Sequence, residues 1–289
     1  MLSLNTNTAA LSTQGSLGST QRALATSMTR LGTGLRINSA MDDAAGLQIA
    51  ARLNAQISGM AVAQRNTQNG ISMLQTGEGA LNEVTNILTR MKDMATESAT
   101  ASTTTEGRAA LQAEYDSLGL ELYNISNNTT FGGNKLLTGG TLAASATLTF
   151  QIGADASEKM SVDLKTTLDD VATKLGAVST NYAATSGGAG AEVSTAAASS
   201  TNLAKLTAAL DAVGKSRGEM GAAANRLDHV YNNLQNVSTN VSAAKGRIMD
   251  TDYATESSNM TSKQMLMQAS SSMLKQANSM SGLVMSLLQ

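Results

Sequence analysis

The chain has 289 residues, of which 42% are hydrophobic, so it can fill the core of one or two ordinary domains. Cysteine is absent, which excludes disulfides, thiolate metal sites and thiol nucleophiles. The net charge of −2 comes without a basic cluster and argues against a nucleic-acid partner. Proline is also absent and aromatic residues make up 2%, so we expect long helices packed through aliphatic residues, Met and Ala.

The first hundred residues predict two helices. Residues 3–36 carry a narrow apolar seam, and Gly32 and Gly34 weaken its end. Asn38-Ser39 are predicted to cap a second helix of about fifty residues that ends near Ser98. Its seam contains Leu53, Ile57, Met60, Ile71, Leu74, Leu81, Val84, Leu88 and Met91.

Shorter elements follow. A turn at 98–105 is predicted to reverse the chain into a helix over Leu111–Ile125. Alternating apolar and polar residues at 147–152 and 160–164 predict a β-hairpin. Residues 166–200 are mostly Ala, Thr, Ser and Gly, and we expect them to form a short variable linker.

The last third of the chain has a long apolar seam with a 3.5-residue period, as in coiled coils. Its residues are Leu203, Leu206, Leu210, Val213, Met220, Leu227, Tyr231, Leu234, Val241 and Ile248. An apolar seam must be buried against another helix, so we expect this helix to pack against the early helices. Residues 255–289 are rich in Met and are expected to pair with the first segment, either as ordinary core or as a seam that tolerates more than one packing.

The charge content indicates an assembly. Charged residues make up 15%, against ~25% in typical soluble domains. Coiled coils normally carry Glu and Lys beside the seam, whereas these helices carry mostly Ala, Ser, Thr, Asn and Gln. We therefore expect a subunit that is packed among other protein. The alternative is a poorly charged soluble bundle.

The residues predict no catalytic, cofactor or metal site. His229 is the only histidine, so histidine-rich zinc sites and Cys/His nucleophiles are excluded. Asp42-Asp43 are consecutive and would point in different directions on a helix, so they cannot act together as a catalytic carboxylate pair. The acidic residues at 250–256 lack the ligand spacing of an EF-hand calcium site. The sequence also lacks a readable secretory signal, and its apolar runs are too short for membrane insertion.

One set of motif residues runs from Leu31 to Ala50 (LGTGLRINSA, then DDAAGLQIA) and continues from Asn69 to Glu83. A second set contains Asn225–Leu227, Arg247–Ile248, Asp252–Glu256 and Asn259–Met260. Both sets resemble the signature of bacterial flagellins. Together the similar regions cover about residues 1–140 and 205–289 in the same order as in the family.

The resemblance implies a mainly α fold, with a long antiparallel helical rod, a terminal coiled coil and a small β-hairpin region. Residues 1–44 and 255–289 would form the inner coiled coil, and 45–165 with 201–254 the rod. Residues 166–200 would then replace the large outer domains of other flagellins. Within them Val193–Thr201 offers hydroxyls for O-glycans, although a low-complexity linker is the simpler interpretation.

The implied function is a secreted structural subunit that polymerises into the extracellular flagellar filament for swimming, without a cofactor. Its implied partners are other copies of itself, an export chaperone, hook–filament junction proteins and cap proteins. The expected polymerisation seam consists of Leu17, Leu24, Met28, Leu31, Leu266, Met273, Met280, Val284 and Leu287. Two terminal strips joined to a rod favour a head-to-tail contact that propagates as an open helix.

Alternative functions belong to other classes. One is an adhesin or immune ligand whose main act is receptor binding, which is compatible with a filament. Another is a secreted membrane-active protein, which would require Trp or a Lys-rich helix face that this chain lacks.

The resemblance also implies recognition by innate immune receptors. The residues that correspond to the Toll-like receptor 5 site are Arg90 and Glu114, with Met94 where the family has Leu. Arg90 and Met94 are four residues apart, so we expect them on one helix face, with recognition weakened but retained. The segment recognised by plants is 29–50; it keeps Arg36, Asp42, Asp43 and Gly46 but has Met41 where many flagellins have Lys.

Overall fold

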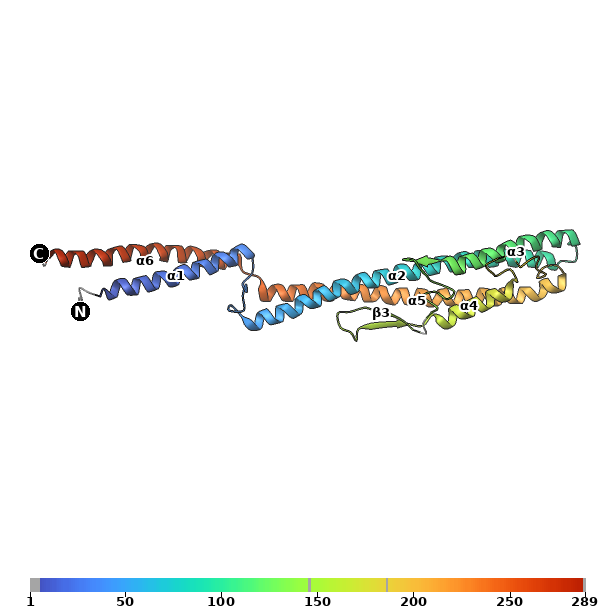
Figure 1. Cartoon of the computed structure of the whole chain (residues 1–289), viewed down its shortest axis with the longest axis horizontal. Coiled ribbons are helices and arrows are strands. Elements are labelled where there is room, and N and C mark those ends of the chain that lie inside the picture. The colour runs from blue at the N-terminus through green and yellow to red at the C-terminus, as the bar shows by residue number, and fades with distance from the viewer. Residues whose placement is uncertain (1–5, 145–146, 186, 288–289) are drawn as a thin grey trace. The chain divides into compact units, whose positions relative to one another are not determined.

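Figure 1 shows the computed structural model, which describes residues 6–144, 147–185 and 187–287, with the backbone alone over 280–287. The chain is mainly α. The helices are α1 (Thr8–Thr33), α2 (Ala44–Ala99), α3 (Thr105–Asn128), α4 (Lys165–Val178), α5 (Ala196–Met249) and α6 (Tyr253–Leu287). The strands are β1 (Thr130–Phe131), β2 (Asn134–Lys135), β3 (Leu148–Gln151) and β4 (Lys159–Val162).

The contacts divide the chain into two compact units. Unit 1 is Met1–Ile57 with Thr239–Gln289, and unit 2 is Ser58–Ser238. Unit 1 therefore reaches further along α2 and α5 than the expected segments 1–44 and 255–289, because both helices run on without a break.

In unit 1 the terminal helices α1 and α6 pair in antiparallel fashion. Near one end of the pair Asn7 Nδ2 donates to the Ala277 carbonyl oxygen at 2.9 Å. Near the other end the Tyr253 hydroxyl donates to the Leu31 carbonyl oxygen at 3.2 Å. As residue numbers rise along α1, the numbers of the contacted residues on α6 fall, so the two helices are antiparallel. The expected pairing of the two termini is observed.

Unit 1 also contains the segments that enter α2 and leave α5. Gly34 ends α1 with φ of 73°, a left-handed conformation that favours glycine. Leu35 and Asp250 form an isolated antiparallel bridge, and Arg36 N donates to the Met249 carbonyl oxygen at 2.6 Å. A small core holds the segments together and consists of Ile37, Ala50 and Met249, with Leu35, Leu47 and Ile248 packed against it.

In unit 2 the helices α2 and α5 form an antiparallel coiled coil, as the seams predict. Buried positions on α2 advance by alternating steps of three and four: Met60, Ala63, Thr67, Gly70, Leu74, Gly77, Leu81, Val84, Leu88, Met91, Ala95 and Ser98. Those on α5 do the same: Ser199, Asn202, Leu206, Ala209, Val213, Ser216, Met220, Ala223 and Leu227. Gln64 Nε2 donates to Gln235 Oε1, and Glu78 pairs with Arg217, which fixes the antiparallel direction.

The remaining elements of unit 2 cover this pair. Helix α3 turns back along α2, where Arg108 Nε donates to the Ser98 carbonyl oxygen. Strands β3 and β4 form the predicted hairpin, with Leu148 opposite Val162. Strands β1 and β2 form a second, shorter hairpin around Gly132 and Gly133.

The segment expected to be a linker is largely ordered. Within it α4 buries four apolar residues at spacings of three, four and three, namely Leu168, Val171, Leu175 and Val178. The start of α5 at Ala196 also makes most of the 193–201 stretch helical. The linker prediction was wrong for these residues because a four-residue seam can add a helix to an existing core without building a core of its own.

Candidate assembly and recognition surfaces

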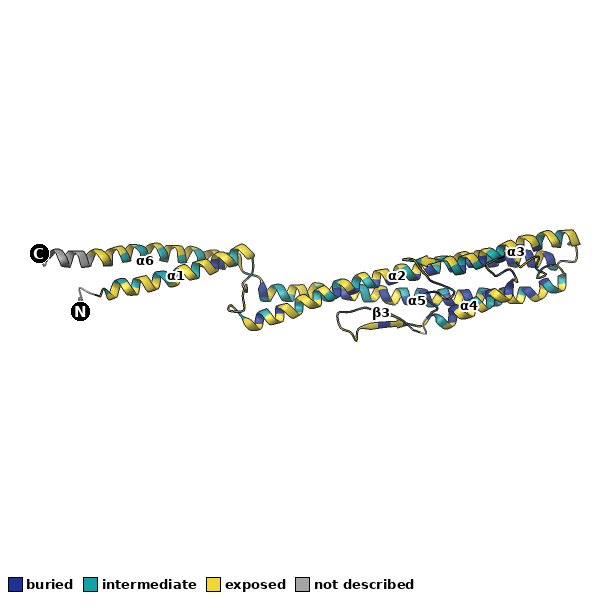
Figure 2. Cartoon of the chain, in the orientation of Figure 1, coloured by how far each residue is buried: buried dark blue, intermediate teal, exposed yellow. Residues whose placement is uncertain are grey.

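The α1–α6 pair has both inward and outward apolar positions. Half-buried residues that face between the two helices include Leu17, Leu24 and Leu31 on α1 and Met260, Met267 and Leu274 on α6. By contrast Met28, Leu266 and Met273 are 59%, 48% and 62% exposed. Figure 2 shows how much of both helices is exposed. The side chains of Met280, Val284 and Leu287 lie outside the described residues.

The expected polymerisation seam therefore divides. Its α1 residues Leu17, Leu24 and Leu31 face α6, whereas its described α6 residues Leu266 and Met273 do not face α1. Met273 precedes the inward Leu274 by one position, which turns it about 100° around the helix. These outward residues are largely exposed in the single chain.

A charged cluster lies where α1 and α6 meet the segment before α2. The Arg30 guanidinium is 3.8 Å from a carboxylate oxygen of Asp42 and 3.8 Å from one of Glu256, which is buried. Backbone hydrogen bonds from Asn38 and Ser39 to Asp42 hold the pKa of that carboxyl below its ordinary value. The cluster links three segments of unit 1 electrostatically.

The cap of α2 differs from the prediction. Asp43 Oδ1 accepts from the backbone N–H of Gly46 at 2.8 Å, so Asp43 caps the helix that begins at Ala44. Asn38 and Ser39 instead donate to Asp42 one turn earlier. Asp43 caps α2 in place of Asn38-Ser39 because it lies directly before Ala44, the first helical residue.

The candidate recognition residues of the 29–50 segment are engaged within unit 1. Arg36 Nη2 donates to the Ile248 carbonyl oxygen at 2.9 Å. Gly46 is buried, and a Cβ there would lie 2.7 Å from Ile37 Cδ1. Asp42 accepts hydrogen bonds in the turn before α2, and Asp43 caps that helix. All four candidate residues therefore make structural contacts within unit 1.

The second group of candidate recognition residues is only partly brought together. Arg90 on α2 and Glu114 on α3 form an ion pair at 2.7 Å, with side chains 56% and 46% exposed. This pairing raises the pKa of the Arg90 guanidinium. Met94, however, is fully buried in the core. Arg90 and Met94 are four residues apart on α2 as expected, but Met94 belongs to the core and is not part of the exposed Arg90–Glu114 surface.

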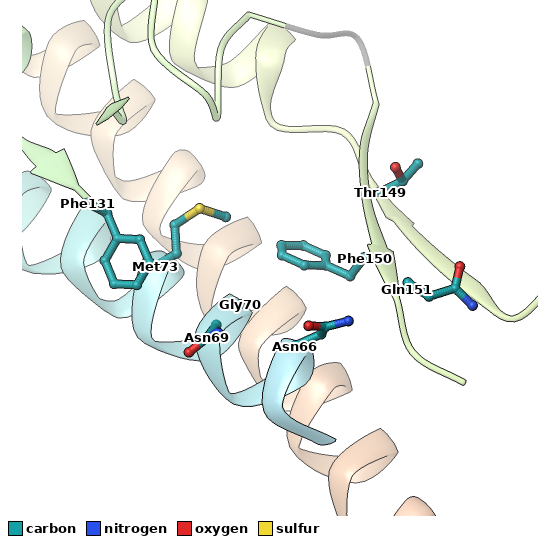
Figure 3. A pocket seen from close by; sticks show the side chains of 8 residues that line it. All are labelled: Asn66, Asn69, Gly70, Met73, Phe131, Thr149, Phe150 and Gln151. Carbon is teal, nitrogen blue, oxygen red and sulfur yellow. The ribbon is translucent and has the colours of Figure 1, made fainter. Parts of the chain in front are cut away.

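A shallow cavity of about 320 Å³ lies between α2 and the two hairpins (Figure 3). It is lined by Asn66, Asn69, Gly70, Met73, Phe131, Thr149, Phe150 and Gln151. The two phenylalanines come from β1 and β3, and the polar groups are amides and one hydroxyl. This lining has no side chain that titrates near neutral pH, so it provides no acid or base.

The loop between α4 and α5 is fastened by a polar clasp, which we define as Gln112, Asp116, Thr180, Glu192 and Val193. Glu192 Oε1 accepts from Thr180 N at 2.6 Å, and its Oε2 accepts from Gln112 Nε2 at 2.9 Å. Gln112 Oε1 in turn accepts from Val193 N at 2.8 Å. Burial alone would raise the pKa of Glu192, but the hydrogen bonds from Thr180 and Gln112 outweigh it and lower that pKa.

A buried tyrosine joins the clasp region to the core. The Tyr115 hydroxyl donates to the Val178 carbonyl oxygen at 3.0 Å and accepts from Asn202 Nδ2 at 2.5 Å. Burial raises the pKa of this phenol, so it stays neutral. Tyr115 lies within the helix predicted over Leu111–Ile125, and no spacing in the sequence indicates its polar partners.

Over the described residues, no three His, Asp or Glu side chains gather in a way that could hold a metal ion. Among the described helices, none combines the length and apolarity needed to cross a bilayer.

Comparison with known proteins agrees with the fold. Residues 4–141 match the model of the bacterial flagellin N-terminal helical region, and 203–288 match that of the C-terminal helical region. The chain is 36% identical to a Bacillus subtilis flagellin over 304 aligned residues and 99% of each chain. It is 35% identical to flagellin C of Vibrio cholerae over 367 aligned residues and 96% of each. A solved structure from Vibrio parahaemolyticus, described as a flagellar hook-associated protein, covers 72% of this chain and all of its own at 17% identity and a TM-score of 0.54, which shows a shared fold.

Proposed function

Because this chain belongs to the bacterial flagellin family, it is a structural subunit of the flagellar filament and not an enzyme, and we propose that its α1–α6 pair provides the surfaces through which copies pack. In this proposal residues 1–44 and 255–289 form the inner coiled coil. Residues 45–165 and 201–254 form the rod, and 166–200 take the place of outer domains. The filament serves swimming.

The observation that supports this proposal is the exposure of large apolar side chains on two helices that bury little between them. Leu11, Met28, Leu266 and Met273 are each about half exposed or more. Burying such surface is favourable by roughly 25 cal/mol per Å². Leu11 and Met28 lie on α1, whereas Leu266 and Met273 lie on α6, so each subunit presents two unlike apolar surfaces, as an open helical polymer requires.

Seeded assembly tests the proposal. Purified subunit is added to short filament seeds, and growth is followed by negative-stain electron microscopy. We expect long tubes from the natural chain and none from a Leu266→Ser/Met273→Ser double variant. Met41→Ser is the matched control, because Met41 is 96% exposed but lies outside both helices. Equal growth of all three proteins would refute the assignment of these surfaces.

Further partners follow from the family. We propose that the chain leaves the cell through the flagellar export apparatus, with a chaperone holding the C-terminal helix. We also propose that it joins hook–filament junction and cap proteins at the filament ends. Pull-down of each purified partner, with a chain that lacks residues 257–289 as control, tests these contacts.

Recognition by an innate receptor is a second proposed role. The exposed Arg90–Glu114 pair supports it, because a partner could reach both charges on neighbouring helices. Met94 is left out of this proposal because its side chain is buried. The 29–50 segment would have to unfold locally before a receptor could bind Arg36, Asp42, Asp43 and Gly46 together.

Arg90→Ala tests the receptor role. With monomeric protein and Toll-like receptor 5 reporter cells, we expect a large loss of signalling with little change in melting temperature, because the ion pair is exposed. Arg65→Ala is the control, since Arg65 is exposed on the same helix. Unchanged signalling by Arg90→Ala, or a silent natural monomer, would show that the site is wrong.

A further inference from the structure

The described methionines fall into distinct groups by exposure. The buried ones are Met60, Met91, Met94, Met160, Met220 and Met249. The exposed ones are Met28, Met41, Met265 and Met273, which are 59%, 96%, 61% and 62% exposed. A thioether in contact with water is open to oxidants, whereas a buried one is shielded by its neighbours.

Three of the exposed methionines lie on the same pair of helices. Met28 is on α1, and Met265 and Met273 are on α6. Met265 precedes the inward Met267 by two positions, which places it on the far side of α6 from α1. Met41 lies in the turn before α2 and thus outside this pair. Three of the four exposed methionines therefore lie on α1 and α6.

We propose that peroxide oxidises Met28, Met265 and Met273 of the free subunit to methionine sulfoxide, and that the modified subunit cannot add to a filament. The inference rests on the proposed packing role of α1 and α6. The three residues thus form a modification site whose oxidant is a peroxide and whose effect is to block assembly.

The chemistry is a two-electron oxygen transfer. A sulfur lone pair attacks one peroxide oxygen, the O–O bond breaks, and an S–O bond forms. The attacked oxygen loses its proton to the departing hydroxide, so one peroxide oxygen stays on sulfur and the other leaves as water. Sulfur is oxidised and peroxide is reduced, with no further reactant.

The product changes the surface in a defined way. A flexible apolar side chain becomes polar, and its new oxygen accepts hydrogen bonds. On a monomer the oxygen is satisfied by water. Packed against a neighbouring subunit it would be left without donors, and burying an unpaired polar group is unfavourable. The free subunit therefore stays folded while its addition to a filament end is disfavoured.

The test compares treated and untreated protein. Subunit is exposed to hydrogen peroxide, sulfoxides are mapped by peptide mass spectrometry, and seed elongation is measured. For the natural chain we expect oxidation at the three sites and elongation at least about tenfold slower. A Met28→Leu/Met265→Leu/Met273→Leu variant, which conserves side-chain volume, should keep the rate of its own untreated sample. Met41→Leu is the control and should remain as sensitive as the natural chain.

Several results would overturn the inference. One is normal elongation by natural protein that is shown to be oxidised at the three sites. Another is a triple variant whose elongation remains as sensitive to peroxide as that of the natural chain. If the triple variant does not assemble at all, oxidation of preformed filaments decides: the three methionines should react more slowly than in free subunit, and equal rates would contradict the proposal. Failure of untreated natural subunit to elongate seeds would instead refute the proposed packing role.

Discussion

At the scale of single residues, glycine controls how closely other elements approach α2. Gly70 occupies a buried seam position, where a Cβ would lie 2.8 Å from Phe150 Cε1 and 3.2 Å from Leu227 Cδ1. Gly79 is on the same helix, but a Cβ there would meet no heavy atom within 4 Å. Gly70 therefore makes room for the β3–β4 hairpin and α5, whereas Gly79 has no such role.

Replacing each glycine by alanine should separate these roles. Gly79→Ala should raise the free energy of unfolding by up to about 1 kcal/mol, because alanine favours the helix. Gly70→Ala should be less stable than Gly79→Ala by at least about 1 kcal/mol, because the Phe150 ring must move. Urea unfolding followed by circular dichroism measures both. Equal stabilisation would show that the hairpin does not depend on the space at Gly70.

Tyr115 gives a second residue-scale prediction. Tyr115→Phe leaves the Val178 carbonyl and the Asn202 amide without their shared partner. We expect a loss of about 1–3 kcal/mol in the free energy of unfolding, because both groups are buried. Tyr123→Phe is the control: its ring packs edge-on against Tyr182 and stays in place. A similar small effect of both variants in urea unfolding would contradict the role of the hydroxyl.

At the scale of elements, the sequence was sufficient wherever the pattern is local. The seams of α2 and α5 were predictable because a 3.5-residue period is visible in one helix without its partner. The β3–β4 hairpin was predictable from two alternating runs around a loop. These two patterns account for the coiled coil of unit 2 and for the element that packs on it.

The sequence was insufficient wherever the burial of a side chain depends on which neighbouring element covers it. Met94 is buried and Met273 is exposed, although both are apolar residues next to a seam position. The clasp around Glu192 depends on groups distant in sequence, such as Gln112, and no spacing reveals them. Helix α4 was missed for another reason: its four apolar residues are visible at Leu168–Val178, but the small residues around them masked the period.

The clasp should make the loop between α4 and α5 sensitive to acid. The pKa of Glu192 in the folded chain lies below its ordinary value of 4.5. Its stabilisation is therefore present above pH 4.5 and is lost as the pH falls through the folded-state pKa. Hydrogen exchange, corrected for intrinsic rates, should show the loop opening over that acid range.

Glu192→Gln is the matched variant for this measurement. At pH 7 its loop should exchange faster than that of the natural chain, because the amide nitrogen cannot accept from Gln112. As the pH falls, the difference from the natural chain should disappear. A difference that is constant with pH would show that the Glu192 carboxylate does not hold the loop.

At the scale of the whole molecule, burial is uneven between the two units. Unit 2 contains a large core drawn from α2, α3, α4, α5 and the hairpins. In α1 the buried residue is Ser27, and in the part of α6 with described side chains it is Glu256. Unit 2 can thus be stable by itself, whereas under the proposed packing the α1–α6 pair would gain most of its burial from neighbouring subunits. This division is what a subunit that adds to a filament requires.

Deleting residues 257–289 tests this account most directly. The truncated chain keeps unit 2 whole and loses nearly all of α6. We expect its cooperative thermal unfolding, followed by circular dichroism, to match that of the natural chain, while seeded assembly yields no filaments in the electron microscope. Normal filaments from the truncated chain, or loss of its cooperative unfolding, would contradict the separation of a stable core from an assembling pair of helices.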